Sequence, residues 1–205
     1  MPRQNRVQPD QAILAHPARG TLTGNRGILD FDAEGRLGIA RWRSKAWITC
    51  TLTHPRGKYQ GPAPVRSWTP LFFLDEAVAL AAGHRPCAYC RRDAYDRFRT
   101  AWTTATSTPP LAPQMDDALH AARVTRNRTQ VRGRAEAADL PPGAFILWQD
   151  QPHLKLVDRI TLYSPDSYGP SFTLPDGPVP VLTPAPTLAI LRAGYCPALH
   201  QSASA

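Results

Sequence analysis

Short apolar runs separated by turn residues dominate the first half of the chain, and they predict a sheet of short strands. Residues 37–42, 46–50 and 71–73 are apolar stretches of strand length. The residues between the last two runs, 54–70, are rich in glycine and proline and predict a loop. Residues 1–20 are polar and mixed, which predicts a flexible arm.

Two stretches have the spacing of helices. Asp75 and Glu76 precede the sequence AVALAAG, and its last residue, Gly83, ends the predicted helix as a C-cap glycine does. A longer amphipathic helix is predicted after residue 90, because its aromatic residues recur at i, i+3 and i+7. These residues are Tyr95, Phe98 and Trp102.

A proline-rich segment at residues 107–113 marks the expected boundary between a first domain, residues 21–106, and a second unit, residues 107–205. The second unit opens with a predicted helix at 115–128 and then changes to short apolar runs typical of strands. Those runs are 144–148, 154–157 and 160–163, and a helix between Pro184 and Gly194 follows them. The whole pattern predicts an α+β fold with a strand-rich C-terminal unit.

The charge of the chain favours a polyanionic partner. Its 24 lysine and arginine residues outnumber 16 aspartate and glutamate residues, and the formal net charge is +8. Nucleic acid, with DNA expected, is the first candidate. Almost all of the cations are arginines, whose planar fork matches phosphate geometry. The alternative is that abundant Arg, Ala and Pro reflect the base composition of the genome.

We expect a cytoplasmic protein. No apolar run approaches the roughly 18 residues that a membrane helix needs. The first residues also lack the apolar core of a secretion signal. Because the cytosol keeps thiols reduced, the four cysteines are not expected to form disulfides.

The spacing of the cysteines predicts a zinc site. Cys87 and Cys90 form a C-x2-C pair, with which one tight turn can supply two ligands to a tetrahedral zinc ion. Cys50 ends a predicted strand, and His54 follows it by four residues, so these two are the expected second pair. Cys196 stands alone near the C-terminus, and we expect it to be a buried free thiol.

The sequence alone leaves more than one candidate for the fourth zinc ligand. His84 precedes Cys87 by three residues and rivals His54 as a ligand. His120 is a further rival if the second half of the chain folds over the site. His54 itself could instead be a solvated loop histidine.

The segment 39–92 resembles the metal-binding domain of the Ada alkylation-repair family. In that family an upstream strand supplies cysteines, an aromatic strand leads into a helix similar to EALAAG, and a turn of the form RPC-x2-C follows. Here Phe72–Ala77 and Ala79–Cys90 match this order closely, and the part before Cys50 matches loosely. The whole chain also resembles a bacterial family from which no activity can be carried over.

The resemblance implies particular roles for the four expected ligands. Ada domains hold zinc with four cysteines, and the first cysteine accepts a methyl group from DNA phosphotriesters; Cys50 takes that position here. His54 replaces the second cysteine, and Cys87 and Cys90 take the third and fourth positions. Three thiolates and an imidazole carry less negative charge than four thiolates, so each thiolate is less nucleophilic. We therefore expect a structural zinc ion and not a methyl acceptor.

Cations near the expected zinc site are candidates for phosphate contacts. The sequence around Trp42 and Trp47 interleaves cations with indoles, which is typical of surfaces that bind phosphates and stack bases. The alternative is an amphipathic strand with both tryptophans in the core. A second basic run, residues 123–134, would add salt-dependent affinity. The expected contacts are Arg41, Arg43, Lys45, Arg85, Arg91 and Arg92.

No catalytic residue is assigned from the sequence. If the chain is an enzyme, a metal-dependent nuclease or an alkyl acceptor, the candidates are Cys50 and His120. His120 lies one helical turn from Asp116 and Asp117, with Arg123 nearby, an arrangement that suits phosphodiester hydrolysis. The alternative is an acidic helix start with a surface histidine. A third possibility for the whole chain is a protein-interaction module stabilised by zinc.

Overall fold

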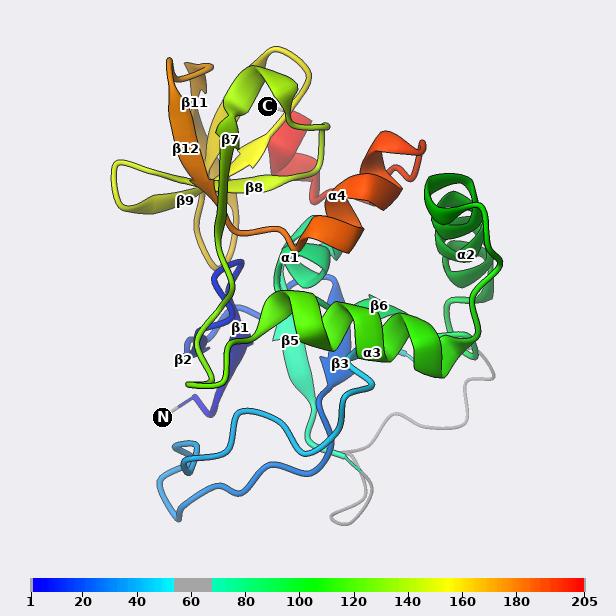
Figure 1. Ribbon diagram of the computed structural model, residues 1–205. Helices are drawn as coiled ribbons and strands as arrows, with labels where there is room; N and C mark the ends of the chain where they lie inside the picture. Colours follow the sequence, from blue (N-terminus) through cyan, green and yellow to red (C-terminus); the bar gives the residue numbers. More distant parts are fainter. Residues whose placement is uncertain (1, 54–67, 205) are drawn as a thin grey trace.

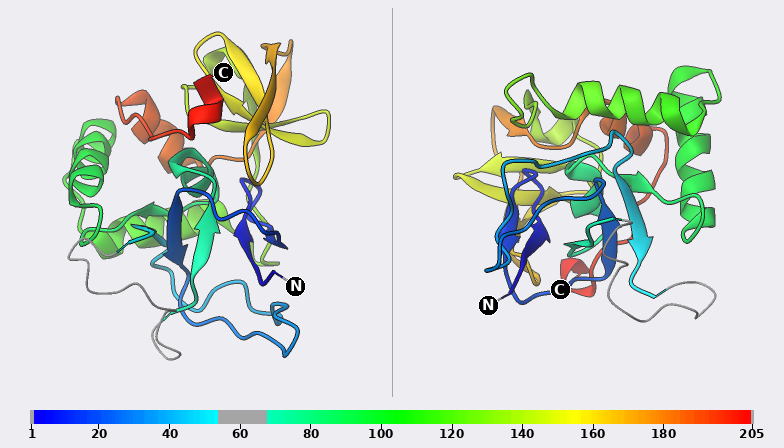
Figure 2. Two further views of the ribbon diagram at one scale, coloured as in Figure 1. Left: turned by 180° about the vertical axis from the view of Figure 1, so that it is seen from behind. Right: turned by 90° about the horizontal axis from the view of Figure 1, so that it is seen from below.

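The computed structural model describes residues 2–53 and 68–204, and these residues form a mixed α+β fold, as predicted (Figure 1). Within these residues the strands form two six-stranded sheets. The two sheets lie at opposite ends of the molecule, with the short helix α1 between them (Figures 1 and 2). No helix in the described ranges combines the length and apolar character that crossing a bilayer requires.

The first sheet has the order β2-β1-β5-β3-β4-β6. Its antiparallel pairs are β1 with β2 and β3 with both β4 and β5, whereas β1 is parallel to β5 and β4 is parallel to β6. The last of these pairs matters most here, because β6 leads directly into the C-x2-C turn. The strands are β1 (Gln4–Val7), β2 (Ile13–Ala15), β3 (Leu22–Asn25), β4 (Ile48–Thr51), β5 (Leu71–Phe73) and β6 (Arg85–Pro86).

The N-terminal segment is part of this sheet, so the prediction of a flexible arm at residues 1–20 is wrong. The hairpin β1–β2 pairs with β5 through Arg6. Val7 and Ile13 are buried in the core that α1 shares with both sheets. Two apolar side chains in a polar stretch are therefore enough to order the segment, because a sheet edge was available for it to pair with.

The strand expected at 37–42 does not form. The structure has only an isolated bridge there, between Phe31 and Leu37, and Ile39 is 87% exposed. Gly38 and Ala40 offer little apolar surface, so the run has nothing to hold it on a sheet.

Helix α1 (Glu76–Ala81) begins and ends where the sequence predicts. The Asp75 side chain accepts a hydrogen bond from the backbone N–H of Val78, and Gly83 has a φ of +83°. Every residue of this helix is buried. The remaining α-helices are α2 (Arg92–Thr106), α3 (Ala112–Arg123) and α4 (Ala185–Arg192).

The second sheet has the order β11-β10-β9-β8-β12-β7. Strands β8 to β11 form an antiparallel meander, and β12 returns to pair with both β8 and β7. The strands expected at 144–148 and 160–163 are confirmed, whereas the one expected at 154–157 overlaps only the last two residues of a strand that begins at Gln151 and ends at Lys155. The strands are β7 (Gly133–Glu136), β8 (Phe145–Trp148), β9 (Gln151–Lys155), β10 (Arg159–Tyr163), β11 (Tyr168–Thr173) and β12 (Pro178–Val181).

The two halves of the chain share their hydrophobic cores across residues 107–113. One core packs Phe73 and Val78 with Phe145 and Leu182. The other joins residues of α1, α2 and α3 to residues of β8, β12 and α4. Helix α3 lies across one face of the first sheet, so the second half of the chain covers the first (Figures 1 and 2).

Candidate metal centre

Three cysteines meet where β4 ends and the turn into α2 begins. Cys50 lies on β4, Cys87 follows β6 directly, and Cys90 comes three residues later, just before α2. Their Sγ atoms all lie within 4.8 Å of one another. In the part of the chain that the structure describes, no other three His, Cys, Asp or Glu side chains come together as a possible metal site.

The register of the sheet brings these thiols together. Thr49 on β4 pairs with Pro86 on β6, and the Cys87 N–H donates to the Thr49 carbonyl at 2.9 Å. Cys50 follows Thr49 and Cys87 follows Pro86, so this register places the two cysteines next to each other. The turn then closes on itself, because the Tyr89 N–H donates to the Cys87 Sγ at 3.4 Å and the Arg91 N–H donates to the Cys87 carbonyl at 3.1 Å.

Two buried ion pairs hold this turn in place. The Arg85 guanidinium binds Asp116 on α3 through both carboxylate oxygens, at 2.7 and 2.8 Å. Arg91 binds Glu76 at 2.8 Å and donates to the Thr49 hydroxyl at 3.0 Å. The turn is thus tied to α3 on one side and to α1 on the other.

These contacts correct two of the expected phosphate contacts. The side chains of Arg85 and Arg91 are only 7% and 9% exposed. A guanidinium that is buried and already bound to a carboxylate has few donors left for a phosphate. Both arginines therefore support the candidate metal site from inside the protein.

The cluster favours a thiolate at Cys87. The Cys50 and Cys90 thiols both hydrogen-bond to Cys87, and the pKa of the Cys87 thiol lies well below its ordinary value for that reason. The same interaction, together with burial, raises the pKa of the Cys50 thiol. Metal ions bind thiolates and not thiols, so a lowered pKa at one of three close sulfurs suits the binding of a cation.

The two histidine candidates that the structure describes, His84 and His120, do not join the three thiols. His54 lies outside the described residues. His84 is fully buried, packs against Trp47 and Phe73 at ring distances of 5.2 and 4.7 Å, and accepts a hydrogen bond from Arg26. Burial and the neighbouring arginines hold the pKa of His84 well below its ordinary value. This histidine is therefore a neutral core residue.

His120 has different neighbours from those of a zinc ligand or a hydrolytic base. Its ring meets the edge of Trp42 at 5.6 Å, and its Nδ1 lies 3.1 Å from an Arg123 nitrogen. Asp116 binds Arg85 and Asp117 binds Lys45, so neither carboxylate orients the imidazole through a hydrogen bond. The candidate hydrolytic arrangement on α3 is not assembled.

The other expected phosphate contacts stay on the surface. Arg43 pairs with Asp30 at 2.7 Å and Lys45 with Asp117 at 2.8 Å, and both cations are more than half exposed. Arg41, which is partly buried, donates to the Gly38 carbonyl. Exposed ion pairs contribute little to stability, so a phosphate can compete for these cations.

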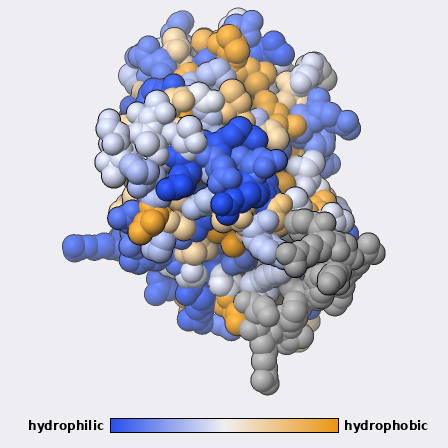
Figure 3. All heavy atoms as spheres, turned by 90° about the vertical axis from the view of Figure 1, so that its right-hand side faces the viewer, coloured by the Kyte–Doolittle hydropathy of each residue, from blue (hydrophilic) through white to orange (hydrophobic). Residues whose placement is uncertain are grey.

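Arg92 lies on a face of mixed charge. It pairs with Asp96 one helical turn further on, at 3.1 Å. Figure 3 shows strongly hydrophilic side chains gathered on the side of the molecule that carries α2. The exposed residues of this helix include arginines and aspartates side by side, which weakens the attraction of this face for phosphate. Those residues are Arg92, Asp93, Asp96, Arg97 and Arg99.

Cys196 is exposed, and the expectation that it is buried is wrong. It lies after α4, directly beside Tyr195, which is buried in the core.

A buried cationic cluster around Trp47 has no signal in the sequence. Arg26 and Arg123 are 1% and 0% exposed, and both guanidiniums stack on Trp47, at 3.8 and 3.9 Å from its ring centre. In the sequence both arginines stand in polar surroundings typical of a surface. Only the packing of α3 on the first sheet buries them.

No family model, no curated protein and no solved structure matches this chain. The likeness to the Ada metal-binding domain therefore depends on the residues from Phe72 to Cys90 and on the position of Cys50, and it stays a prediction.

Proposed function

We propose that the chain is a zinc-binding protein whose zinc ion has a structural role and whose surface arginines contact nucleic acid, with DNA as the expected form. The observation that carries the proposal is the convergence of Cys50, Cys87 and Cys90, with their sulfurs within 4.8 Å of one another.

Zinc suits this set of ligands better than other common metals. Thiolates are soft ligands, and structural zinc sites are tetrahedral with four cysteine or histidine ligands, three cysteines and one histidine among them. His54 follows β4 by three residues and remains the first candidate for the fourth position. The buried ion pairs of Arg85 and Arg91 support a structural role, because they fix the turn from both sides.

Metal content tests the zinc site. We expect about one zinc ion per chain in the wild type, measured by inductively coupled plasma mass spectrometry on protein purified without added metal. Cys87→Ser should lose most of it, while Cys196→Ser, which removes an exposed cysteine outside the cluster, should retain it. If Cys87→Ser retains the zinc content of the wild type, the proposed zinc site is refuted. Full zinc in His54→Ala would remove only the fourth ligand.

The nucleic-acid part of the proposal is supported by charge. The net charge is +8, and Arg41, Arg43 and Lys45 remain at the surface near one another in sequence. For binding through phosphate contacts, the logarithm of the binding constant falls linearly with the logarithm of the salt concentration. Fluorescence anisotropy with a labelled DNA strand and its duplex, from 25 to about 200 mM salt, should show this dependence. No binding of either form at the lowest salt would refute the proposal.

A further inference from the structure

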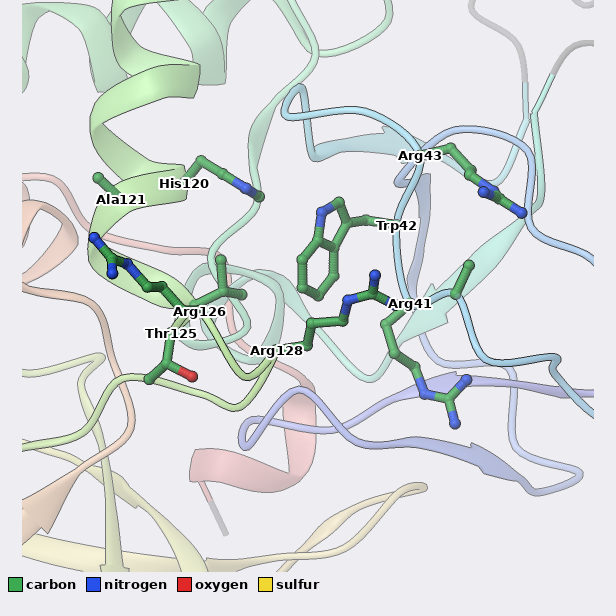
Figure 4. A pocket seen from close by; sticks show the side chains of 10 residues that line it. Arg41, Trp42, Arg43, His120, Ala121, Thr125, Arg126 and Arg128 are labelled. Carbon is green, nitrogen blue, oxygen red and sulfur yellow. The ribbon is translucent and has the colours of Figure 1, made fainter.

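A cavity of about 410 Å³ opens between residues 40–43 and the C-terminal end of α3 (Figure 4). It lies within the range of about 300–1,000 Å³ that is typical of sites for small organic groups. One indole, one imidazole and four guanidiniums dominate its lining. These belong to Trp42, His120, Arg41, Arg43, Arg126 and Arg128.

The structure holds Trp42 at the wall of this cavity. Its ring contacts buried Trp47, with ring centres 5.7 Å apart, and meets the His120 ring edge-on at 5.6 Å. Two arginines stack on Trp47, but among the described residues none stacks on Trp42. Trp42 is therefore fixed in position and only partly buried, as a stacking platform must be.

His120 can present a hydrogen-bond donor to the cavity. Arg123 can only donate, so its contact with His120 makes Nδ1 the acceptor and leaves the proton of a neutral ring on Nε2. Burial and the Arg123 charge lower the pKa of His120, which keeps the ring neutral. Figure 4 shows the imidazole pointing toward the Trp42 indole.

Positive charge gathers beneath and around the cavity. The buried guanidiniums of Arg26 and Arg123 form no ion pair within residues 2–53 and 68–204, and each keeps one nitrogen without a hydrogen-bond partner there. The Asp116 carboxylate, whose charge reaches Arg123, is already bound by Arg85. A surplus of charge behind a concave surface attracts an anion into it.

The outer arginines are placed for a phosphate backbone. Figure 4 shows Arg128 pointing toward the indole, while Arg41, Arg43 and Arg126 point outward from it. Of these four, Arg43 alone has a carboxylate partner in the described part of the chain, namely Asp30. Cations outside and an aromatic platform inside are the two elements with which proteins hold single strands.

We propose that this cavity binds a nucleobase of single-stranded nucleic acid, stacked on Trp42, with the flanking phosphates on the surrounding arginines. The inference rests on the proposed function and names its ligand: the form with unpaired bases. A base inside a duplex is already stacked and paired, so it cannot enter the cavity without being extruded.

Substitutions at Trp42 test the proposal on the full chain with its zinc ion. The probe is a fluorescein-labelled 12-nucleotide thymidine strand, with a 12-base-pair duplex as comparison, both followed by anisotropy at fixed low salt. Trp42→Ala should weaken binding of the strand by about 5- to 150-fold, the usual worth of one stacked base. Binding of the duplex should be unchanged. Trp42→Phe keeps an aromatic ring and should retain most of the affinity.

Arginine variants separate charge from stacking. Arg126→Gln should lower the salt slope for the strand by about 0.7, the value for one lost phosphate contact, whereas Trp42→Ala should leave the slope unchanged. Arg192→Gln removes the same charge from α4, outside the cavity, and should change neither the slope nor the affinity for the strand. Equal effects of Arg126→Gln and Arg192→Gln would overturn the assignment of the phosphate contacts.

The outcomes distinguish this inference from the proposed function. If the wild type binds neither strand nor duplex, both fail. If it binds nucleic acid but Trp42→Ala and Trp42→Phe bind the strand as tightly as the wild type, only the stacking site is overturned. Competition with thymidine monophosphate separates a strand from a free nucleotide as the ligand. If thymidine monophosphate displaces the labelled strand at the same concentration as an unlabelled strand does, a free nucleotide and not a strand is the ligand.

Discussion

Two neighbouring aspartates on α3 offer a direct measurement of what burial adds to an ion pair. Asp116 binds Arg85 at 2.7 and 2.8 Å, and both side chains are at most 10% exposed. Asp117 binds Lys45 at 2.8 Å, and both of those side chains are more than 60% exposed. The distances are alike, but the pairs differ in their access to water and in the number of hydrogen bonds, because Arg85 makes two to its carboxylate and Lys45 makes one.

Asp116→Asn should destabilise the protein far more than Asp117→Asn. Without the carboxylate, the Arg85 guanidinium stays buried and water cannot replace its partner, a loss of about 3–5 kcal/mol. Water solvates Lys45 once Asp117 is neutral, so that loss is small. The total stability of a folded domain is about 5–15 kcal/mol, so the first change removes a large share of it.

Urea unfolding at saturating zinc, followed by far-UV circular dichroism, gives both free energies of unfolding by linear extrapolation. The double variant Arg85→Met/Asp116→Leu should recover much of the lost stability, because no buried charge is left unpaired. Arg85 precedes Cys87 by two residues, so Asp116→Asn should also weaken metal binding at the proposed zinc site. The reasoning is refuted if Asp116→Asn and Asp117→Asn differ by less than about 1 kcal/mol in free energy of unfolding.

Two further predictions concern the residues that end α1 and follow it. The folded protein keeps His84 neutral because its pKa is lowered, whereas the unfolded chain takes up a proton below about pH 6.5, so stability should fall with decreasing pH in that range. The free energy of unfolding should change by up to about 1.4 kcal/mol per pH unit. Urea unfolding at pH 7.5, 6.5 and 5.5 should show a smaller pH dependence in His84→Gln. An equal pH dependence in the variant and the wild type would count against a neutral, buried His84. Gly83→Ala forces a Cβ to within 2.4 Å of the Arg123 Cδ at a φ of +83°, whereas Gly194→Ala meets no atom within 4 Å at a φ of +97°. Each should cost about 1–2 kcal/mol for the left-handed backbone, and thermal unfolding should show a larger loss for Gly83→Ala; equal losses would mean that Arg123 moves aside freely.

The features that could be predicted from the sequence depend on neighbours along the chain. The cap at Asp75 and the glycine at Gly83 fix α1 because their partners lie within one helical turn. The aromatic spacing in α2 likewise depends only on its own period, and Tyr95, Phe98 and Trp102 are all buried as expected. The C-x2-C pair is local too, because one turn holds both cysteines.

The fate of the arginines could not be predicted in this way. Arg85 and Arg91 flank the C-x2-C turn and suggest a basic surface, yet each is bound to a buried carboxylate distant in sequence. Whether an arginine faces water or the core depends on what packs over it, and no local pattern records that.

The sequence by itself determined the local elements and the cysteine ligands of the candidate metal site: the strand that carries Cys50, the turn that carries Cys87 and Cys90, and the capped helix between them. Hydrogen bonds within a turn and the periodicity of side chains involve residues that are close in sequence, so the sequence is enough to predict them. Only the tertiary structure decided that β4 and β6 run side by side, that Arg123 at the end of α3 is buried against Trp47 and His120, and that a basic cavity results. Those arrangements join elements up to a hundred residues apart, and they follow from burying apolar surface and pairing buried charge across the whole fold.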